Sequence, residues 1–143
     1  MRIERATASD ARAVEALLAA AGLPLDGAEE ALARGVVARD GDRVVAAAAI
    51  ERYGSAGLLR SVVVSADRRG TGVGRGIVEA AEALACGEGL TDLYLLTETA
   101  ADWFRRLGYG VVARGDAAAA VGASIEFTTV CRDVGVAMRK TLA

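Results

Sequence analysis

Histidine is absent from the 143-residue sequence, and aromatic residues make up only 4% of it. The absence of histidine removes the side chain that most often acts as a general base near neutral pH and most often binds metal ions. The two cysteines, Cys86 and Cys131, are far apart and form no CxxC pair. A disulfide framework or a zinc site is therefore not expected, and we expect a reducing, cytoplasmic location and no bound metal.

Basic charge is not in excess, because 17 Lys and Arg residues stand against 19 Asp and Glu residues and give a net charge of −2. A general nucleic-acid binder normally carries a basic excess, so this class of partner is not expected. Long apolar runs are also missing, since the longest, Val44–Ile50, is far too short to span a bilayer. The N-terminus carries Arg2, Glu4, Arg5 and Asp10 and shows no signal peptide. We expect neither a membrane nor a nucleic acid as partner.

What the sequence does contain is a succession of apolar patterns with the periods of strands and helices. Ser9 can cap a first helix that Gly22 and Pro24 end, and Asp40-Gly41-Asp42 separates two apolar runs as in a β-hairpin. The predicted elements are a strand at 2–7, helices at 9–21 and 26–33, two strands within 35–54, a strand at 58–64, a helix at 73–86, a strand at 91–97, a helix at 98–108, a strand at 111–114, a short helix at 116–124 and a strand at 134–142. This order predicts an α/β (α+β) fold with a mixed sheet of about seven strands and helices on both faces, as a single domain over residues 1–143.

Three glycines, Gly70, Gly72 and Gly74, stand where the predicted long helix should begin. Glycine there costs roughly 0.5–1 kcal/mol per site relative to alanine, so the bare backbone must serve a purpose. The first amides of a helix lack internal partners, and with the helix dipole they bind anions that can approach closely. Arg69 and Arg75 could add charge-assisted hydrogen bonds. The turn predicts a phosphate or pyrophosphate ligand, with a purely structural strand-to-helix turn as the alternative.

Two well-known phosphate motifs do not fit this turn. The Walker pattern needs a lysine that is not present here, and the dinucleotide fingerprint needs a glycine where Arg75 or Ile77 stands. The pattern R-x-x-G-x-G at 69–74, after a Val-Val-Val strand, instead resembles the acyl-CoA pyrophosphate loop of the GNAT N-acetyltransferases. The segment TAADWFRRLGY at 99–109 is similar to the GNAT helix that follows the fifth strand. In that family this helix splays from the fourth strand, and the pantetheine arm lies in the gap.

A narrower resemblance is to the arsenic-resistance N-acetyltransferase family within GNAT. It rests on ERYGSAGLLRSVVV at 51–64, LYLLTETAADWFRRLGY at 93–109, IEFTTVC at 125–131 and VAMRKTL at 136–142. In that family the cysteine of the third segment is often followed by proline, whereas Arg132 follows Cys131 here. Cys131 could meet a soft arsenical, with a buried and inert thiol as the alternative.

The GNAT resemblance implies an acetyl-CoA-dependent enzyme that moves acetyl directly onto an amine, as a monomer or homodimer. A backbone amide of the fourth strand near Val63 would polarise the thioester carbonyl, and a donor of this kind is worth roughly 10²–10³ in rate. The resemblance implies cofactor contacts at Val62, Val63, Val64, Arg69, Gly70, Thr71, Gly72, Val73, Gly74, Arg75, Thr99 and Phe104.

The proton of the acceptor ammonium must go to a group other than histidine. Glu51, late in the third strand, is the first candidate, and Glu98 and Glu126 are the others. A solvated surface position is the alternative for Glu51 and Glu126. The tyrosine that protonates the thiolate in the family falls at Phe104, which has no hydroxyl.

Tyr53 or Ser61 could replace that tyrosine, or the thiolate could leave unassisted, because a thiol pKa of about 8.5 allows it. Arg60, beside Ser61, could bind the carboxylate of an amino acid or organoarsenical analogue, or it could form a salt bridge with Glu51 or Glu98. The expected acceptor site consists of Glu51, Tyr53, Arg60, Ser61, Glu98 and Glu126, and the expected catalytic groups are Glu51, Ser61 and Val63. This lining suits a small zwitterionic amine. The alternative function is a non-catalytic sensor of the same fold that binds acetyl-CoA.

Overall fold

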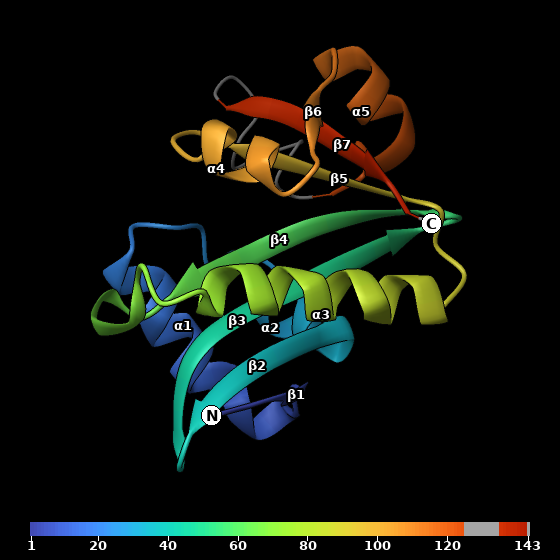
Figure 1. The fold of residues 1–143 in the computed structure, drawn as a ribbon. Coiled ribbons are helices and arrows are strands. Elements are labelled where there is room, and N and C mark those ends of the chain that lie inside the picture. The colour runs from blue at the N-terminus through green and yellow to red at the C-terminus, as the bar shows by residue number, and fades with distance from the viewer. Residues whose placement is uncertain (125–134, 143) are drawn as a thin grey trace.

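A seven-stranded sheet in the order β1-β2-β3-β4-β5-β7-β6 forms the centre of the computed structural model, which describes residues 1–124 and 135–142 (Figure 1). The strands are β1 Arg2–Arg5, β2 Gly35–Asp40, β3 Arg43–Tyr53, β4 Ala56–Val64, β5 Asp92–Thr97, β6 Gly110–Val111 and β7 Val136–Thr141. The pair β4–β5 is parallel, and the other neighbouring pairs are antiparallel. The predicted mixed sheet and the predicted order of elements are both confirmed.

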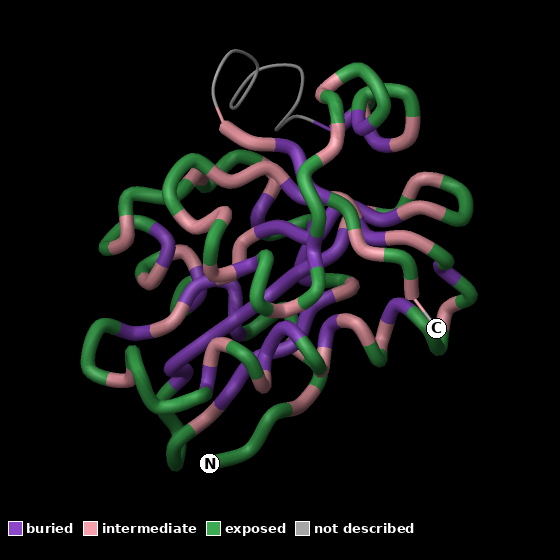
Figure 2. The backbone as a smooth tube through the Cα atoms, turned by 45° about the horizontal axis from the view of Figure 1, so that its top comes forward, coloured by how far each residue is buried: buried purple, intermediate pink, exposed green. Residues whose placement is uncertain are grey.

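Five α-helices in the described part of the chain cover the two faces of this sheet. They are α1 Ala11–Ala20, α2 Ala28–Ala31, α3 Val73–Gly87, α4 Ala101–Arg106 and α5 Arg114–Val121. Side chains alternate along a strand, so Ala48 and Ile50 of β3 pack in the α3 cluster, while Ala47 packs in the α1 cluster. Because both faces are covered, β3 is buried over its centre, as Figure 2 shows for the sheet. Among the described residues, no helix has the length and apolar character needed to cross a membrane.

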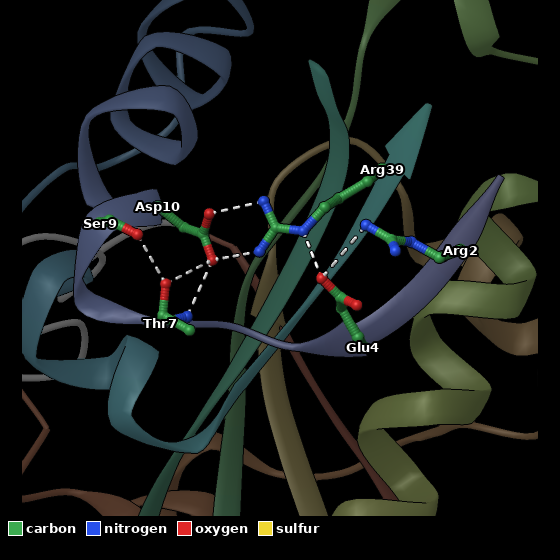
Figure 3. A network of polar contacts seen from close by, with 6 residues as sticks. All are labelled: Arg2, Glu4, Thr7, Ser9, Asp10 and Arg39. Carbon is green, nitrogen blue, oxygen red and sulfur yellow. Dashed lines mark hydrogen bonds and ion pairs between the residues drawn. The ribbon is translucent and has the colours of Figure 1, made fainter. Parts of the chain in front are cut away.

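The cap of the first helical segment lies two residues before Ser9, the predicted cap. Thr7 is the capping residue of a short 3-10 helix, Ala8–Asp10, that leads into α1. The Asp10 carboxylate accepts a hydrogen bond of 2.8 Å from the Thr7 amide and two from the Arg39 guanidinium of β2 (Figure 3). The prediction of Ser9 was wrong because its hydroxyl bonds to the Thr7 hydroxyl, while Asp10 satisfies the free amide.

The predicted strand at 111–114 is also shorter than expected. Gly110 and Val111 pair with β7, and the Val112 amide adds one more bond to Ala137. The chain then enters α5 at Arg114. Two valines are too few to extend a strand at the edge of the sheet, so the prediction was correct for position 111 and wrong for the residues after it.

The strands β4 and β5 separate along their length, and this separation shapes the molecule. Their parallel ladder joins Ala56–Leu58 to Asp92–Tyr94 and, among the described residues, extends no further. In Figure 1 the two strands then diverge towards the N-terminal end of α3. Beyond this ladder the two strands no longer pair with each other, while β4 still pairs with β3 and β5 with β7.

Candidate active site

A cavity of about 730 Å³ lies where β4 and β5 diverge. Its walls come from the second half of β4, from the end of β5 and the start of α4, from the turn before α3, and from the connection between α1 and α2. The lining residues are Ala21, Leu23, Pro24, Leu59, Arg60, Ser61, Val62, Val63, Val64, Arg68, Arg69, Gly70, Gly72, Gly74, Arg75, Leu95, Leu96, Thr97, Glu98, Thr99, Ala100, Trp103, Phe104 and Gly135. A cavity of this size fits a ligand of several hundred daltons.

The glycine-rich turn forms one end of the cavity. Gly70 has a φ of 77° and Gly72 a φ of 86°, a left-handed conformation that residues with a Cβ rarely adopt. Gly72 caps α3, and the amide of Gly76 is the donor that closes the first helical turn, at 3.1 Å from the Gly72 carbonyl. The amides of the three residues before Gly76 thus have no acceptor within the helix, as an anion site requires.

The third glycine, Gly74, lines the cavity as the other two do and has a steric reason besides. A Cβ at Gly74 would lie 2.9 Å from Cζ2 of Trp103 and 3.3 Å from Cγ2 of Val64. Gly74 therefore allows the Trp103 ring of α4 to pack close to the first turn of α3. By contrast, a Cβ at Gly70 or Gly72 would meet nothing within 4 Å, so these two positions need glycine for their backbone conformation.

The basic residues near the turn differ in how they are held. Arg68 is paired with Asp40 of β2, and Arg75 with Glu79 one helical turn away at 3.3 Å. Arg69 is exposed and has no ion pair with any residue that the structure describes. Arg69 is therefore the arginine of this group most ready to meet an incoming anion.

A β-bulge interrupts β4 at the wall of the cavity. Ala47 pairs with Val63 and Ala49 with Arg60, so Ser61 and Val62 together face Ala48 of β3. Ser61 has a φ of 56° and is, within the described ranges, the non-glycine residue with a positive φ. The bulge changes the direction in which the following amides point.

Behind this wall, Glu51 is part of a polar cluster. Its carboxylate accepts a 2.8 Å bond from Nη1 of Arg60 and a 2.5 Å bond from the Tyr53 hydroxyl. The Arg60 side chain has 0% exposure and that of Glu51 has 16%. Burial alone would raise the pKa of Glu51, but the hydrogen bonds from Tyr53, Ser124 and Arg60 outweigh it and lower that pKa. Of the two alternatives for Arg60, the salt bridge with Glu51 is the one observed.

Tyr53, one candidate to replace the family tyrosine that falls at Phe104, is bonded to Glu51. Burial, followed by its hydrogen bond to Glu51, raises its pKa to about 12, and Tyr53 is not among the cavity-lining residues. Phe104 does line the cavity, and its ring packs edge-on against Trp103 and Tyr109 at centroid distances of 4.9 and 5.7 Å. Ser61 is the remaining hydroxyl candidate that lies at the cavity.

Most of the predicted site residues are brought together by the fold. The predicted residues that line the cavity are Arg60, Ser61, Val62, Val63, Val64, Arg69, Gly70, Gly72, Gly74, Arg75, Glu98, Thr99 and Phe104. Glu51 and Tyr53 lie outside the lining; so do Thr71, whose hydroxyl bonds to the Arg68 carbonyl, and Val73, whose side chain is in the core. Glu126 and Cys131 lie outside the described residues. The described residues contain no cluster of three or more acidic or cysteine side chains that could bind a metal ion.

Two parts of the site were missed by the sequence analysis. Leu23 and Pro24, between α1 and α2, line the cavity, although Pro24 was interpreted as a helix end. Trp103 lines it as well, although the sequence analysis assigned it no contact with the cofactor. The available signal was the pair of apolar residues Leu23 and Leu25 in a predicted loop, both of which are well exposed in the structure.

The parallel pair that opens, the bulge in β4 and the glycine-capped α3 define an acyltransferase fold. A model of the acetyltransferase (GNAT) domain family matches residues 31–111, more than half of the chain, and the chain belongs to this family of acetyl-CoA-dependent acyltransferases. The match is to the family as a whole, so the narrower arsenic-resistance assignment stays a prediction. No curated protein matches the sequence.

Solved structures resemble this chain along its whole length. Rv2747 from Mycobacterium tuberculosis, in complex with CoA, is 22% identical with a TM-score of 0.79 and 100% of both chains covered. The N-acetylglutamate synthase from Neisseria gonorrhoeae, complexed with coenzyme A and N-acetyl-glutamate, is 16% identical with a TM-score of 0.84, and the match covers 99% of this chain and 35% of that one. An aminoglycoside 6'-N-acetyltransferase complexed with coenzyme A is 18% identical with a TM-score of 0.74, over 100% of this chain and 98% of that one. At these identities the likeness shows the fold.

Proposed function

We propose that this protein is an N-acetyltransferase that moves acetyl from acetyl-CoA to the amine of a small molecule. The observation that carries the proposal is the 730 Å³ cavity between β4 and β5, which ends at the glycine-capped N-terminus of α3. An elongated thioester with a diphosphate at one end fits this arrangement. The diphosphate would meet the first amides of α3 and Arg69, and the pantetheine arm would lie along Val62 and Val64.

The chemistry follows from the groups around the bulge. The amide of Val63, or that of Val62, would polarise the thioester carbonyl as the acceptor amine attacks it. Glu98 carries the one carboxylate among the described cavity-lining residues, and we assign it to receive the ammonium proton, directly or through water. Glu51 is less suited to that task, because its lowered pKa makes it a weak base. The thiolate would leave unassisted or with a proton from Ser61.

The acceptor we propose is a small amine such as an amino acid or an organoarsenical analogue, in a resistance or detoxification role. The support is the resemblance of the sequence to the arsenic-resistance family, together with the mixed character of the cavity wall near the bulge. Leu23 and Pro24 offer an apolar surface there, and Glu98 and Ser61 a polar one. Two structural neighbours, an N-acetylglutamate synthase and an aminoglycoside 6'-N-acetyltransferase, have names that also point to small amines as acceptors.

Two measurements test this function. Calorimetric titration with acetyl-CoA should give saturable binding. A thiol-release assay over a panel of amines, with amino acids and organoarsenical amino acids included, should give turnover with at least one of them. Absence of binding would remove the proposal, and binding without turnover on the whole panel would favour the non-catalytic sensor.

A further inference from the structure

Ser61 is held in a backbone conformation that a serine adopts at a cost. Its φ of 56° lies in the left-handed region, where a residue with a Cβ is disfavoured by roughly 1–2 kcal/mol. The strain falls at the bulge in β4, directly before Val62 and Val63, which line the cavity. Strain at such a place persists when the surrounding structure enforces it.

Arg60, the residue before Ser61, holds Ser61 in this conformation. Side chains of successive residues in an extended strand point to opposite faces, so Arg60 could not reach Ser61 in a regular β4. At the bulge, Nε of Arg60 donates a 3.1 Å hydrogen bond to Oγ of Ser61. This bond exists because of the left-handed turn, and it therefore stabilises the turn.

The guanidinium that makes this bond is itself fixed. Its Nη1 lies 2.8 Å from Oε2 of Glu51 on β3, and the other oxygen of Glu51 accepts the hydrogen bond from Tyr53. The Arg60 side chain is fully buried, and a buried guanidinium cannot give up its carboxylate partner without a large desolvation cost. A planar guanidinium that donates hydrogen bonds from two of its edges has little rotational freedom left.

We propose that Arg60 and Glu51 are positioning residues, whose ion pair locks the left-handed turn at Ser61 and so aims the amide of Val62 at the acetyl carbonyl. The inference rests on the acetyl transfer proposed above. With 0% exposure, the Arg60 side chain presents no surface to an acceptor, so it acts through the backbone that it holds.

The decisive variant is Arg60→Met, with Arg60→Met/Ser61→Gly as its rescue and Arg139→Met as its control. Arg139 also pairs with a carboxylate of a neighbouring strand, Asp92 at 2.8 Å, but it lies away from the bulge. Arg60→Met should lower kcat by about 10- to 100-fold, less than the roughly 10²–10³ for removing an oxyanion donor outright, while the Kd of acetyl-CoA changes by less than about threefold. The double variant should recover about tenfold of that loss, because glycine holds a positive φ without help.

Rescue by glycine separates positioning from simple support of the fold, since Ser61→Gly replaces no lost packing. Because Ser61 is itself a candidate proton donor, the double variant is compared with Ser61→Gly alone. An unchanged kcat in Arg60→Met overturns the proposal, and so does a double variant whose kcat stays well below that of Ser61→Gly. Amide hydrogen exchange at residues 61–64, followed by NMR, gives a readout that needs no acceptor. It should accelerate in Arg60→Met and slow again in the double variant, and unchanged exchange contradicts the lock even if the protein transfers no acetyl at all.

Discussion

Two of the arginines that carboxylates bind, Arg39 and Arg60, lie in different parts of the sheet. Arg39 of β2 donates to both oxygens of Asp10, at 2.7 and 2.8 Å, and also contacts Glu4 of β1 (Figure 3). Arg60 of β4 donates to Glu51 at 2.8 Å. The chemistry of the two pairs is the same.

Their surroundings differ. The Arg39 cluster joins β1, the start of α1 and a part of β2 away from the cavity, so it connects elements to one another. The Arg60 pair spans the bulge and lies against the cavity wall. Both arginines lie at an irregularity of the sheet, since the β2–β3 register shifts between Ala38 and Arg39. We infer that the position of an ion pair relative to the cavity, and not its strength, determines whether it serves the fold or the reaction.

The largest effect should follow from breaking the Arg39 cluster. Asp10→Ala leaves a guanidinium that is only 16% exposed without its main partner, so the free energy of unfolding should fall by about 3 kcal/mol. Urea denaturation measures this loss. The matched control is Glu4→Ala, which removes the more exposed carboxylate from the same arginine and should cost much less. Turnover per folded molecule should stay unchanged in both variants, and a specific loss of turnover in Asp10→Ala would abolish the distinction between the two clusters.

A second substitution tests the cofactor end of the cleft and leaves Arg39 and Arg60 unchanged. Gly72→Val should raise the Kd of acetyl-CoA by about 10- to 100-fold, because a β-branched side chain disrupts the left-handed cap and fills the space an anion would occupy. Its control is Gly89→Val, at a φ of 83° where a Cβ also meets nothing within 4 Å.

Each of these two glycine variants should lose roughly 1–2 kcal/mol of stability, by thermal unfolding, because the backbone strain is alike. Only Gly72→Val should lose affinity in calorimetric titration. Equal affinities in the two variants would show that the turn does not bind the cofactor.

The variant Glu51→Gln tests whether Glu51, in its pair with Arg60, positions the backbone of β4 or accepts a proton. Its lowered pKa keeps Glu51 ionised well below neutrality, so a positioning role predicts that kcat falls by about tenfold, evenly between about pH 6 and about pH 9. Glu98→Gln should instead remove the acidic limb of the pH–rate profile. A Glu51→Gln profile that loses this limb would identify Glu51 as the general base, which was the first choice from the sequence.

The smallest effect is expected at Arg69. Arg69→Gln should weaken acetyl-CoA binding by about three- to fivefold and make the affinity less sensitive to salt, because an exposed charge is screened. Arg52→Gln, at the far end of β3 and bonded to the carbonyls of Gly54 and Glu88, is the control and should change neither quantity. A salt dependence that is the same in both variants would remove Arg69 from the cofactor site.

The order of the elements and most of the cleft wall could be predicted from the sequence. The period of the apolar residues gave the long helix at 73–87 to within one residue, and the Gly70–Gly72 turn pointed to an anion site, because both signals are local. The Thr7 cap and the short β6 were not predicted, since the first depends on Asp10 and Arg39 and the second on which strand lies at the edge.

The sequence by itself determined that this chain forms a mixed sheet with helices on both faces and a left-handed glycine turn before its longest helix. The period of the apolar residues and the placement of glycine involve only a few neighbouring residues. They can therefore be interpreted without knowledge of the tertiary structure. Tertiary structure alone decided that Gly74 makes room for Trp103, that β4 parts from β5 after Leu58, and that Arg60 pairs with Glu51 behind a strained Ser61. These features arise between residues distant in sequence, where burial and strand register select one partner among several of the right chemistry.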